Sequence, residues 1–220
     1  PVTYLLHGYG GWYANWIIRV PELKFYADQY QMMLVCPEGN NDWYINSPEI
    51  DSLQWETYIA VEIPAYIDSH YPTKANRMGR AITGLSMGGH GGLYLGLKNS
   101  TTFGACGSMS GGVDLRFRKS SWSLLRLLGD TTQHAQRWID YSVTGLVDKI
   151  KPGESEIIID CGTEDFFFGI NEKLHQQLAL RGIPHEYTTR AGKHDWNYWK
   201  NAVSFQLLFF HHYFTKTETP

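Results

Sequence analysis

Residues 84–88, which read Gly-Leu-Ser-Met-Gly, form the segment of this sequence best suited to chemistry. A strand-like run at 80–83 precedes them and a helical pattern at 87–98 follows. This is the strand–turn–helix context that a Gly-x-Ser-x-Gly nucleophile elbow requires. The turn would hold the Ser86 hydroxyl at the carboxyl edge of a sheet, near helix N–H groups that favour developing negative charge. We therefore interpret Ser86 as a nucleophile; the alternative is a purely structural turn.

A serine hydroxyl needs a general base, and a histidine oriented by a carboxylate supplies one. Of the nine His in the chain, His194 is the one in a loop directly after the last expected strand. In hydrolases with this elbow the chain order is serine, acid, histidine, which fits Ser86 and His194. A lone histidine is more often a solvated or core residue, but this position and order favour the catalytic interpretation.

Three carboxylates near the end of the penultimate expected strand are candidates for the acid: Asp160, Glu164 and Asp165. Asp160 lies within the strand, where a hydrogen bond to a backbone turn is the simpler role. Asp165 stands where a loop side chain can turn back toward His194, so we prefer it to Glu164. Its role would be to fix the imidazole tautomer and to stabilise the imidazolium.

Acyl transfer also needs N–H donors for the tetrahedral oxyanion. The backbone N–H of Met87, at the start of the helix after Ser86, is the natural first donor. For the second, the glycine-rich residues 7–11 follow the first expected strand and can approach the serine closely. We expect the Tyr9 N–H to be this donor and that of Gly10 to be the next candidate. A strand-to-helix turn without a catalytic role is the alternative.

Short apolar runs alternate with longer helical patterns along the chain. Most runs are apolar at consecutive positions, as expected of strands covered on both faces. The alternation predicts an α/β fold with a mainly parallel sheet and helices on both faces. Pro64 should kink the helix in which it lies. The expected strands are 2–6, 32–36, 80–83, 103–108, 156–160 and 185–189, and the expected helices are 55–71, 87–98, 171–181 and 196–214.

No strand is expected between residues 111 and 153, a stretch too long for an ordinary connection. Its Leu and Trp residues recur at roughly helical spacing, so we predict a partly helical insertion over the sheet and hypothesise that it acts as a lid. No repeat or Pro/Ser linker divides the chain, which indicates one domain over residues 1–220. Because residues 2–6 already resemble a strand, we expect the leading strands of the sheet to be absent from this chain.

Composition excludes several other classes of protein. With 19 Lys+Arg against 22 Asp+Glu and a formal net charge of −3, the chain lacks an electrostatic grip on nucleic acid or anionic membranes. It has no run of about 18 apolar residues that would span a bilayer. The three Cys show no metal-binding spacing, so we expect buried free thiols and no metal at these residues.

Three segments together resemble the esterase D-type esterases, which have the α/β-hydrolase fold. They are Tyr-Leu-Leu-His-Gly-Tyr-Gly-Gly at 4–11, Ala-Ile-Thr-Gly-Leu-Ser-Met-Gly-Gly at 81–89 and Gly-Lys-His-Asp-Trp at 192–196. The family includes S-formylglutathione hydrolases, tributyrin-type esterases, feruloyl and acetyl xylan esterases, and mycolyltransferases. The resemblance implies a serine carboxylester hydrolase that acts through an acyl-enzyme and uses no cofactor.

Carried over residue by residue, the resemblance gives Ser86, Asp165 and His194 the roles of the catalytic triad. It gives the backbone N–H groups of Met87 and Tyr9 the role of the oxyanion hole. The glycine-rich first loop is closer to the carbohydrate and lipid esterase branches than to the formylglutathione branch. We therefore expect acyl esters of carbohydrates, or other short-chain or aromatic acyl esters, as substrates.

Aromatic residues are unusually frequent, with eight Trp, fourteen Tyr and ten Phe. Several stand beside the expected site, where rings can stack on a sugar face or on a cinnamoyl group. Ordinary loop packing is the alternative. The residues that we expect to contact the substrate are Trp12, Trp43, Tyr44, Phe166 and Trp196.

The same residues are compatible with other functions. The same triad would suit an S-formylglutathione-type thioesterase or an acyl transferase, and a hydrolase fold can also bind a glycan without turnover. The expected partner is a small-molecule or glycan ester, with no nucleic acid and no membrane. A carbohydrate esterase would be secreted or periplasmic, and a thioesterase cytoplasmic.

Overall fold

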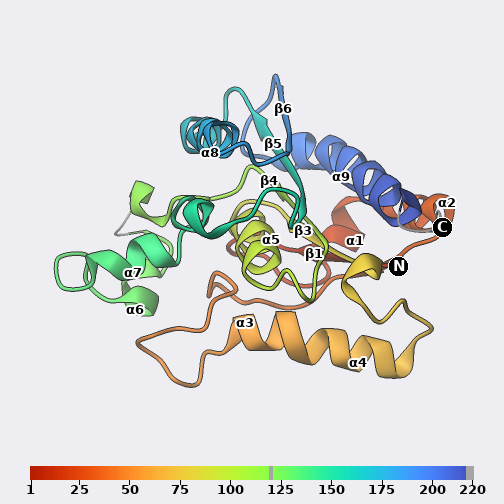
Figure 1. Ribbon diagram of the computed structural model, residues 1–220, viewed down its shortest axis with the longest axis horizontal. Helices are drawn as coiled ribbons and strands as arrows, with labels where there is room; N and C mark the ends of the chain where they lie inside the picture. Colours follow the sequence, from red (N-terminus) through yellow and green to blue (C-terminus); the bar gives the residue numbers. More distant parts are fainter. Residues whose placement is uncertain (119–120, 217–220) are drawn as a thin grey trace.

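A parallel β-sheet forms the centre of the computed structural model, which describes residues 1–118 and 121–216 (Figure 1). Within those residues the sheet has six strands in the order β2-β1-β3-β4-β5-β6, and each neighbouring pair is parallel. This confirms the α/β class and the parallel sheet predicted from the apolar runs. The strands are β1 (Val2–Leu6), β2 (Met33–Val35), β3 (Arg80–Gly84), β4 (Ala105–Met109), β5 (Glu156–Gly162) and β6 (Glu186–Arg190).

Helices cover both faces of the sheet (Figure 1). One cluster of buried apolar side chains joins the first face to its helices, and a second cluster joins the opposite face to the rest. Burial of this apolar surface is the main stabilising contribution in such a layered fold. The first face carries α4 (Ile63–His70), α5 (Met87–Lys98) and α8 (Phe168–Leu180), and the opposite face carries α1 (Asn15–Arg19), α2 (Leu23–Tyr30) and α9 (Trp196–Lys216).

Two stretches differ from the sequence prediction. The helices α1 and α2 were not expected. The helix expected over 55–71 consists of α3 (Trp55–Thr57), a π-helical turn η1 (Tyr58–Glu62) and then α4. Pro64 is the second residue of α4 and follows the π turn within helix that is continuous over residues 55–70, so its missing N–H cannot donate to the preceding turn. The π turn therefore stands where we expected a kink.

Residues 111–153, between β4 and β5, carry short helices but no strand within their described part. In Figure 1, α6 and α7 lie beside each other at the left, away from α9. This segment also contacts α5, where the His90 Nε2 lies 2.8 Å from the Tyr141 carbonyl oxygen. Burial lowers the pKa of His90 to about 4, so its ring is neutral. The elements are η3 (Leu115–Arg118), α6 (Leu124–Leu128), α7 (Ala135–Asp140), η4 (Val143–Gly145) and η5 (Val147–Lys149).

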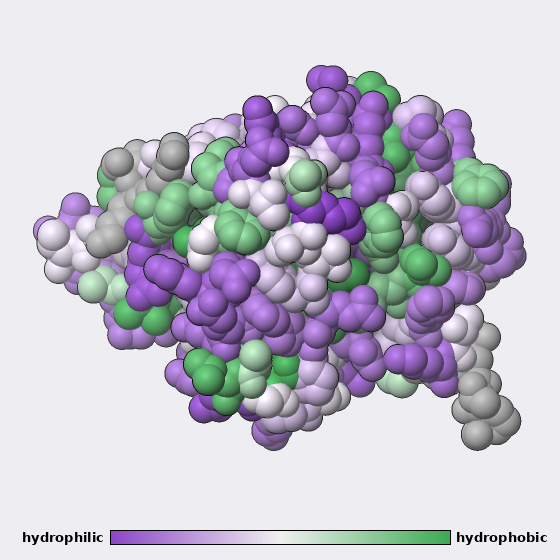
Figure 2. Space-filling model, turned by 90° about the horizontal axis from the view of Figure 1, so that it is seen from above, coloured by the Kyte–Doolittle hydropathy of each residue, from purple (hydrophilic) through white to green (hydrophobic). Residues whose placement is uncertain are grey.

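Seen from above, apolar residues are scattered among polar ones instead of forming one large patch (Figure 2). Among the described residues no helix is long and apolar enough to cross a membrane, and no group of three His, Cys, Asp or Glu side chains could hold a metal ion. The three cysteines are free; Cys106 and Cys161 are buried, and Cys36 is partly exposed.

Candidate active site

Ser86 lies in a tight turn between β3 and α5, with φ 57° and ψ −115°. Its N–H donates to the Met109 carbonyl oxygen at 2.9 Å, which ties the turn to β4. A Cβ atom at Gly84 would lie 2.6 Å from the carbonyl oxygens of Gly88 and Leu6, so only glycine fits there. The strained serine and its flanking glycines together form the geometry of a nucleophile elbow.

Ser86, His194 and Asp165 lie in one hydrogen-bonded series. The Ser86 Oγ is 2.9 Å from His194 Nε2, and His194 Nδ1 is 2.8 Å from Asp165 Oδ2. The Asp165 side chain is fully buried, and its Oδ1 accepts the Phe167 N–H at 2.8 Å. Each side chain follows the end of a different strand (β3, β5 and β6), so the parallel sheet brings together residues that are 108 and 29 positions apart in the chain.

Three aromatic rings surround the His194 imidazole. Its centroid lies 4.3 Å from that of Phe166, 5.3 Å from that of Phe167 and 4.9 Å from that of Trp199. The Phe167 and Trp199 rings meet it edge-on. These contacts exclude water from the ring faces while its two nitrogens stay bound to the carboxylate and the hydroxyl.

The other two candidate acids have different partners. Glu164 is exposed and lies 3.9 Å from Lys193 Nζ. Asp160 is fully buried, forms an ion pair with Arg190 and accepts a hydrogen bond from the Tyr198 hydroxyl. Burial raises the pKa of Asp160, against the lowering effect of Tyr198 and Arg190. Asp160 thus joins β5, β6 and α9 and has no contact with His194 among the described residues.

The first loop approaches the serine closely. Gly8 lies against Ser86, since a Cβ atom at Gly8 would be 3.4 Å from the Ser86 Cβ. The Gly10 N–H donates to Asn41 Oδ1 at 2.6 Å and is therefore occupied. In the described part of the chain the N–H groups of Tyr9 and Met87 donate to no other group. The geometry thus favours Tyr9 over Gly10 as the second oxyanion donor.

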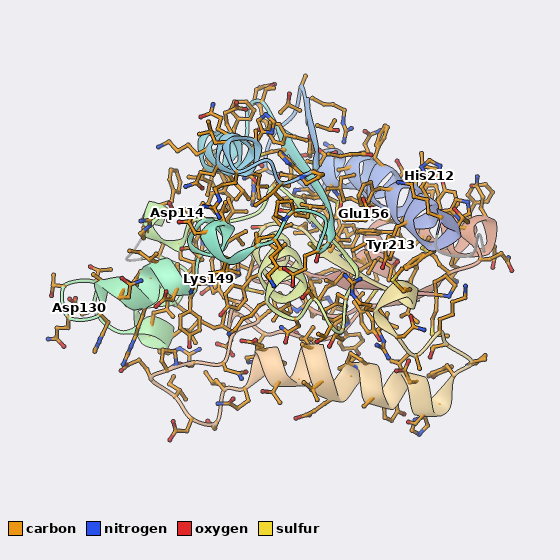
Figure 3. All side chains as sticks on the ribbon, viewed as in Figure 1. Asp114, Asp130, Lys149, Glu156, His212 and Tyr213 are labelled. Carbon is orange, nitrogen blue, oxygen red and sulfur yellow. The ribbon has the colours of Figure 1, made fainter. Side chains whose placement is uncertain are left out.

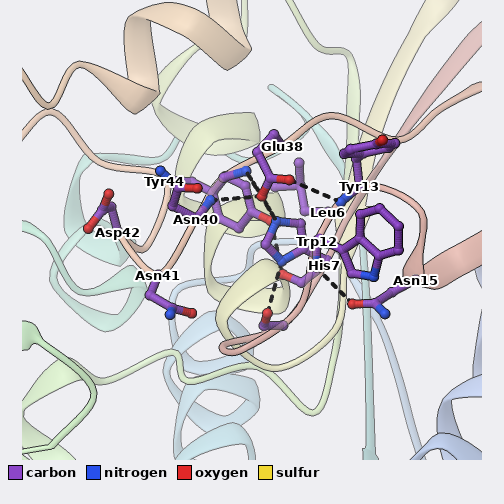
Figure 4. Close-up of polar contacts among 12 residues, drawn as sticks. Leu6, His7, Trp12, Tyr13, Asn15, Glu38, Asn40, Asn41, Asp42 and Tyr44 are labelled. Atoms are coloured by element: carbon purple, nitrogen blue, oxygen red, sulfur yellow. Dashed lines mark hydrogen bonds and ion pairs between the residues drawn. The ribbon is translucent and has the colours of Figure 1, made fainter.

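The buried His7 ring and the partly exposed Glu38 carboxylate form a pair beside this loop (Figure 4). His7 Nε2 lies 2.8 Å from Glu38 Oε1, and its Nδ1–H donates to the Gly8 carbonyl oxygen at 2.9 Å. Burial acts to raise the Glu38 pKa, but the N–H groups of Gly39 and Asn40, each at 3.0 Å, outweigh it and lower the pKa. The Glu38 carboxylate, which stays ionised, and the His7 ring therefore tie the first loop to residues 38–40.

A cavity of about 320 Å³ opens beside Ser86 and His194. Of the aromatic residues expected at the substrate, Trp43, Phe166 and Trp196 line it. Asn15 and Arg19 of the unexpected helix α1 also line the cavity and were not predicted. The aromatic side chains that line it, apart from Tyr9, are Trp43, Trp122, Phe166, Phe167, Trp196 and Trp199.

Trp12 and Tyr44 are not among the described residues that line this cavity. Tyr44 is 0% exposed, and its hydroxyl donates to the His7 carbonyl oxygen at 3.0 Å. It is therefore a core residue. Trp12 is 44% exposed and packs edge-on against Tyr13 outside the cavity. The prediction that Trp12 and Tyr44 contact the substrate in this cavity was therefore wrong, because their loops direct one side chain outside the cavity and the other into the core.

The tip of the 111–153 segment reaches the cavity. Trp122 lines it, and the Trp122 carbonyl oxygen accepts the Trp43 Nε1–H at 2.9 Å. The hydroxyls of Ser123 and Tyr9 lie 2.9 Å apart. The segment is thus held against the first loop, and its function as a lid stays a prediction.

A second cavity, of about 310 Å³, lies elsewhere. Its lining includes Glu156, His212 and Tyr213, which Figure 3 labels near the C-terminal part of α9. Glu156 is the first residue of β5, whereas the residues near Ser86 follow strand ends. The second cavity therefore opens at the opposite edge of the sheet from the serine.

Comparisons with known proteins identify relatives of this chain. The model of the family described as "Putative esterase" matches residues 1–210. An acetyl esterase from Caldicellulosiruptor saccharolyticus is 30% identical over 217 residues, which cover 91% of this chain and 79% of that protein. An esterase from Mycobacterium tuberculosis is 28% identical over 220 residues; the match covers 88% of this chain and only 48% of that protein.

Two solved structures have the same architecture. A ferulic acid esterase has 27% sequence identity and a TM-score of 0.78, covering 97% of this chain and 85% of its own. A fluorophosphonate-binding serine hydrolase of Staphylococcus aureus, FphF, has a TM-score of 0.84 at 20% identity, covering 96% of this chain and 83% of its own. The latter likeness shows the fold alone.

Fold and site together define an α/β-hydrolase of the carboxylic ester hydrolase class. Because the family model matches nearly the whole chain, the chain belongs to this esterase family.

Proposed function

We propose that this chain hydrolyses carboxylic esters through an acyl-enzyme on Ser86, with acyl esters of carbohydrates or other short-chain or aromatic acyl esters as substrates. The hydrogen-bonded series of Ser86, His194 and Asp165 beside an aromatic cavity carries the proposal. Each of the three groups has the partner that its chemical role requires.

In the acylation step, Ser86 Oγ attacks the ester carbonyl carbon and its proton passes to His194 Nε2. Asp165 holds the opposite ring nitrogen and stabilises the imidazolium that forms. The carbonyl oxygen becomes an oxyanion that accepts the N–H groups of Tyr9 and Met87. When the tetrahedral intermediate collapses, the bond to the alcohol oxygen breaks and the alcohol leaves with the proton from His194.

In the deacylation step, water takes the place of the alcohol. His194 removes a proton from the water as its oxygen attacks the acyl carbon. The second tetrahedral intermediate breaks at the bond to Ser86 Oγ, which regains a proton from the imidazolium. The carboxylic acid then leaves, and the free serine is restored.

The volume of the cavity favours substrates with an acyl group of modest size. Its volume of about 320 Å³ is at the lower end for small-molecule sites. Its aromatic walls can stack on a planar acyl group or a sugar face. The similarity to an acetyl esterase and to a ferulic acid esterase supports the same substrate class for this chain.

Hydrolysis of acetyl-xylan, methyl ferulate, tributyrin and S-formylglutathione by wild type and Ser86→Ala tests this proposal. We expect wild type to favour the oxygen esters, and Ser86→Ala to lower kcat at least about 1000-fold, since the nucleophile is lost. Ser69→Ala removes an exposed hydroxyl on α4 and is the control, with kinetics unchanged. Undiminished turnover by a folded Ser86→Ala would refute the mechanism; a preference for S-formylglutathione would refute only the substrate class.

A further inference from the structure

Arg19 is the one cationic Arg or Lys among the described residues that line the Ser86 cavity. It is the last residue of α1, and its guanidinium carbon lies 6.0 Å from the centroid of the Trp196 ring. The side chain is exposed at the mouth of the cavity and is available to a bound molecule. Because Arg19 and Ser86 line the same cavity, the charge of Arg19 bears on which ester binds there.

Helix α1 is anchored so that Arg19 keeps this position. The Trp16 side chain is 0% exposed, and its Nε1–H donates to the Leu6 carbonyl oxygen at 3.0 Å. The same indole meets the Trp196 ring edge-on, with centroids 5.3 Å apart. Trp16 therefore holds both α1 and the Trp196 ring in place, and this fixes the backbone position of Arg19.

Arg19 has no carboxylate partner in the part of the chain that the structure describes. No carboxylate oxygen there lies within 4.0 Å of its guanidinium, and no hydrogen bond satisfies its N–H groups. Six other arginines among the described residues pair with carboxylates. Arg80 pairs with Asp68, Arg116 with Asp114, Arg126 with Asp42, Arg137 with Glu49, Arg181 with Asp148 and Arg190 with Asp160.

The cavity around Arg19 has no compensating negative charge either. None of the described residues that line it is Asp or Glu. Asn15 also lines it and uses its Oδ1 to accept the Trp12 N–H at 2.8 Å, so its amide N–H groups are what it can offer to a ligand. Although the chain has a net charge of −3, the described residues that line this cavity are cationic or neutral.

We propose that Arg19 determines specificity by binding a carboxylate carried on the ester, either on its acyl portion or on its alcohol portion. This inference rests on the proposed function and extends it to anionic esters. The planar guanidinium can bind a carboxylate through two parallel N–H···O bonds. The positive charge also raises the local concentration of an anionic substrate that the rest of the molecule would repel.

Two pairs of esters test this inference and separate its two arms. For the alcohol portion, 4-acetoxybenzoate is compared with its neutral methyl ester. For the acyl portion, monomethyl terephthalate is compared with methyl 4-methylbenzoate. Each ester is compared between wild type and variants, so that its intrinsic reactivity cancels.

We expect Arg19→Gln to lower kcat/KM for one anionic ester about tenfold, mainly through KM, and to change its neutral counterpart by less than about twofold. The pair that responds identifies the portion that bears the carboxylate. Arg19→Lys keeps the charge and should recover part of the loss. Added NaCl should reduce the preference in wild type, because salt screens an exposed charge.

Lys24→Gln is the matched control, since it removes one positive charge from α2, outside the lining of this cavity. It should leave all four esters unaffected. An Arg19→Gln variant that treats anionic and neutral esters alike would overturn the role of Arg19. A wild-type protein that hydrolyses none of the four esters would instead contradict the proposed function.

Discussion

His194 performs every proton transfer in the proposed reaction, and the residues around it fix its ring. Asp165 uses one carboxylate oxygen for His194 and the other for the Phe167 N–H, so the carboxylate is held at both ends. The surrounding aromatic rings leave only 15% of the His194 side chain exposed. These contacts support our proposal that Asp165 is the acid.

Exchanging the two neighbouring acids separately tests this assignment. Asp165→Asn should lower kcat by about 10,000-fold, because the amide cannot stabilise the imidazolium or select the reactive tautomer. Glu164→Gln should leave kcat unchanged, since Glu164 is exposed and contacts Lys193 instead. Steady-state hydrolysis of a neutral acetate ester measures both. A large loss of kcat in Glu164→Gln with none in Asp165→Asn would show that the acid is Glu164 and not Asp165.

The loops that carry Asp165 and His194 follow β5 and β6, and a buried polar cluster holds these strands to α9. Asp160 of β5 contacts both Arg190 of β6 and Tyr198 of α9. The Arg190 guanidinium lies over the rings of Tyr198 and Phe205, at 5.6 and 4.3 Å from their centroids. We infer that this cluster sets the distance between the acid and the histidine.

Tyr198→Phe should therefore affect both stability and rate. Without the phenol, one oxygen of the buried Asp160 loses its donor, which should lower the free energy of unfolding by about 1–3 kcal/mol. The rate kcat should also fall, because the His194 loop loses a fixed point. Urea denaturation and steady-state kinetics measure the two effects. Tyr30→Phe, on α2, is the control and should change neither; an equal loss in both variants would contradict the role of the cluster.

At the scale of the whole molecule, the elbow motif, the apolar runs and the chain order predicted a parallel sheet with Ser86, Asp165 and His194 at one edge. The reason is physical: parallel strands bring their carboxyl ends to one edge, so loops that follow successive strands meet there. The elbow motif and the apolar runs are local signals that the fold does not override. The α/β class was confirmed for the same reason.

Residues whose positions depend on tertiary contacts were not predictable in this way. Trp43 and Tyr44 are adjacent, and both have left-handed backbone, with φ 58° and 59°. One side chain lines the cavity and the other enters the core, which no local pattern reveals. Trp122 meets Trp43 across 79 positions of chain, within a segment whose only sequence signal was helical spacing. Arg19 lies on a helix that the sequence analysis did not identify.

The central claim is that Ser86 is the nucleophile, and labelling with a fluorophosphonate probe tests it most directly. The probe forms a covalent bond to an activated serine oxygen, and peptide mass spectrometry locates the modified residue. We predict one label per chain, on the peptide that contains Ser86, and none on Ser86→Ala. A label on another serine, such as the buried Ser110, or labelling that persists in Ser86→Ala would contradict the account.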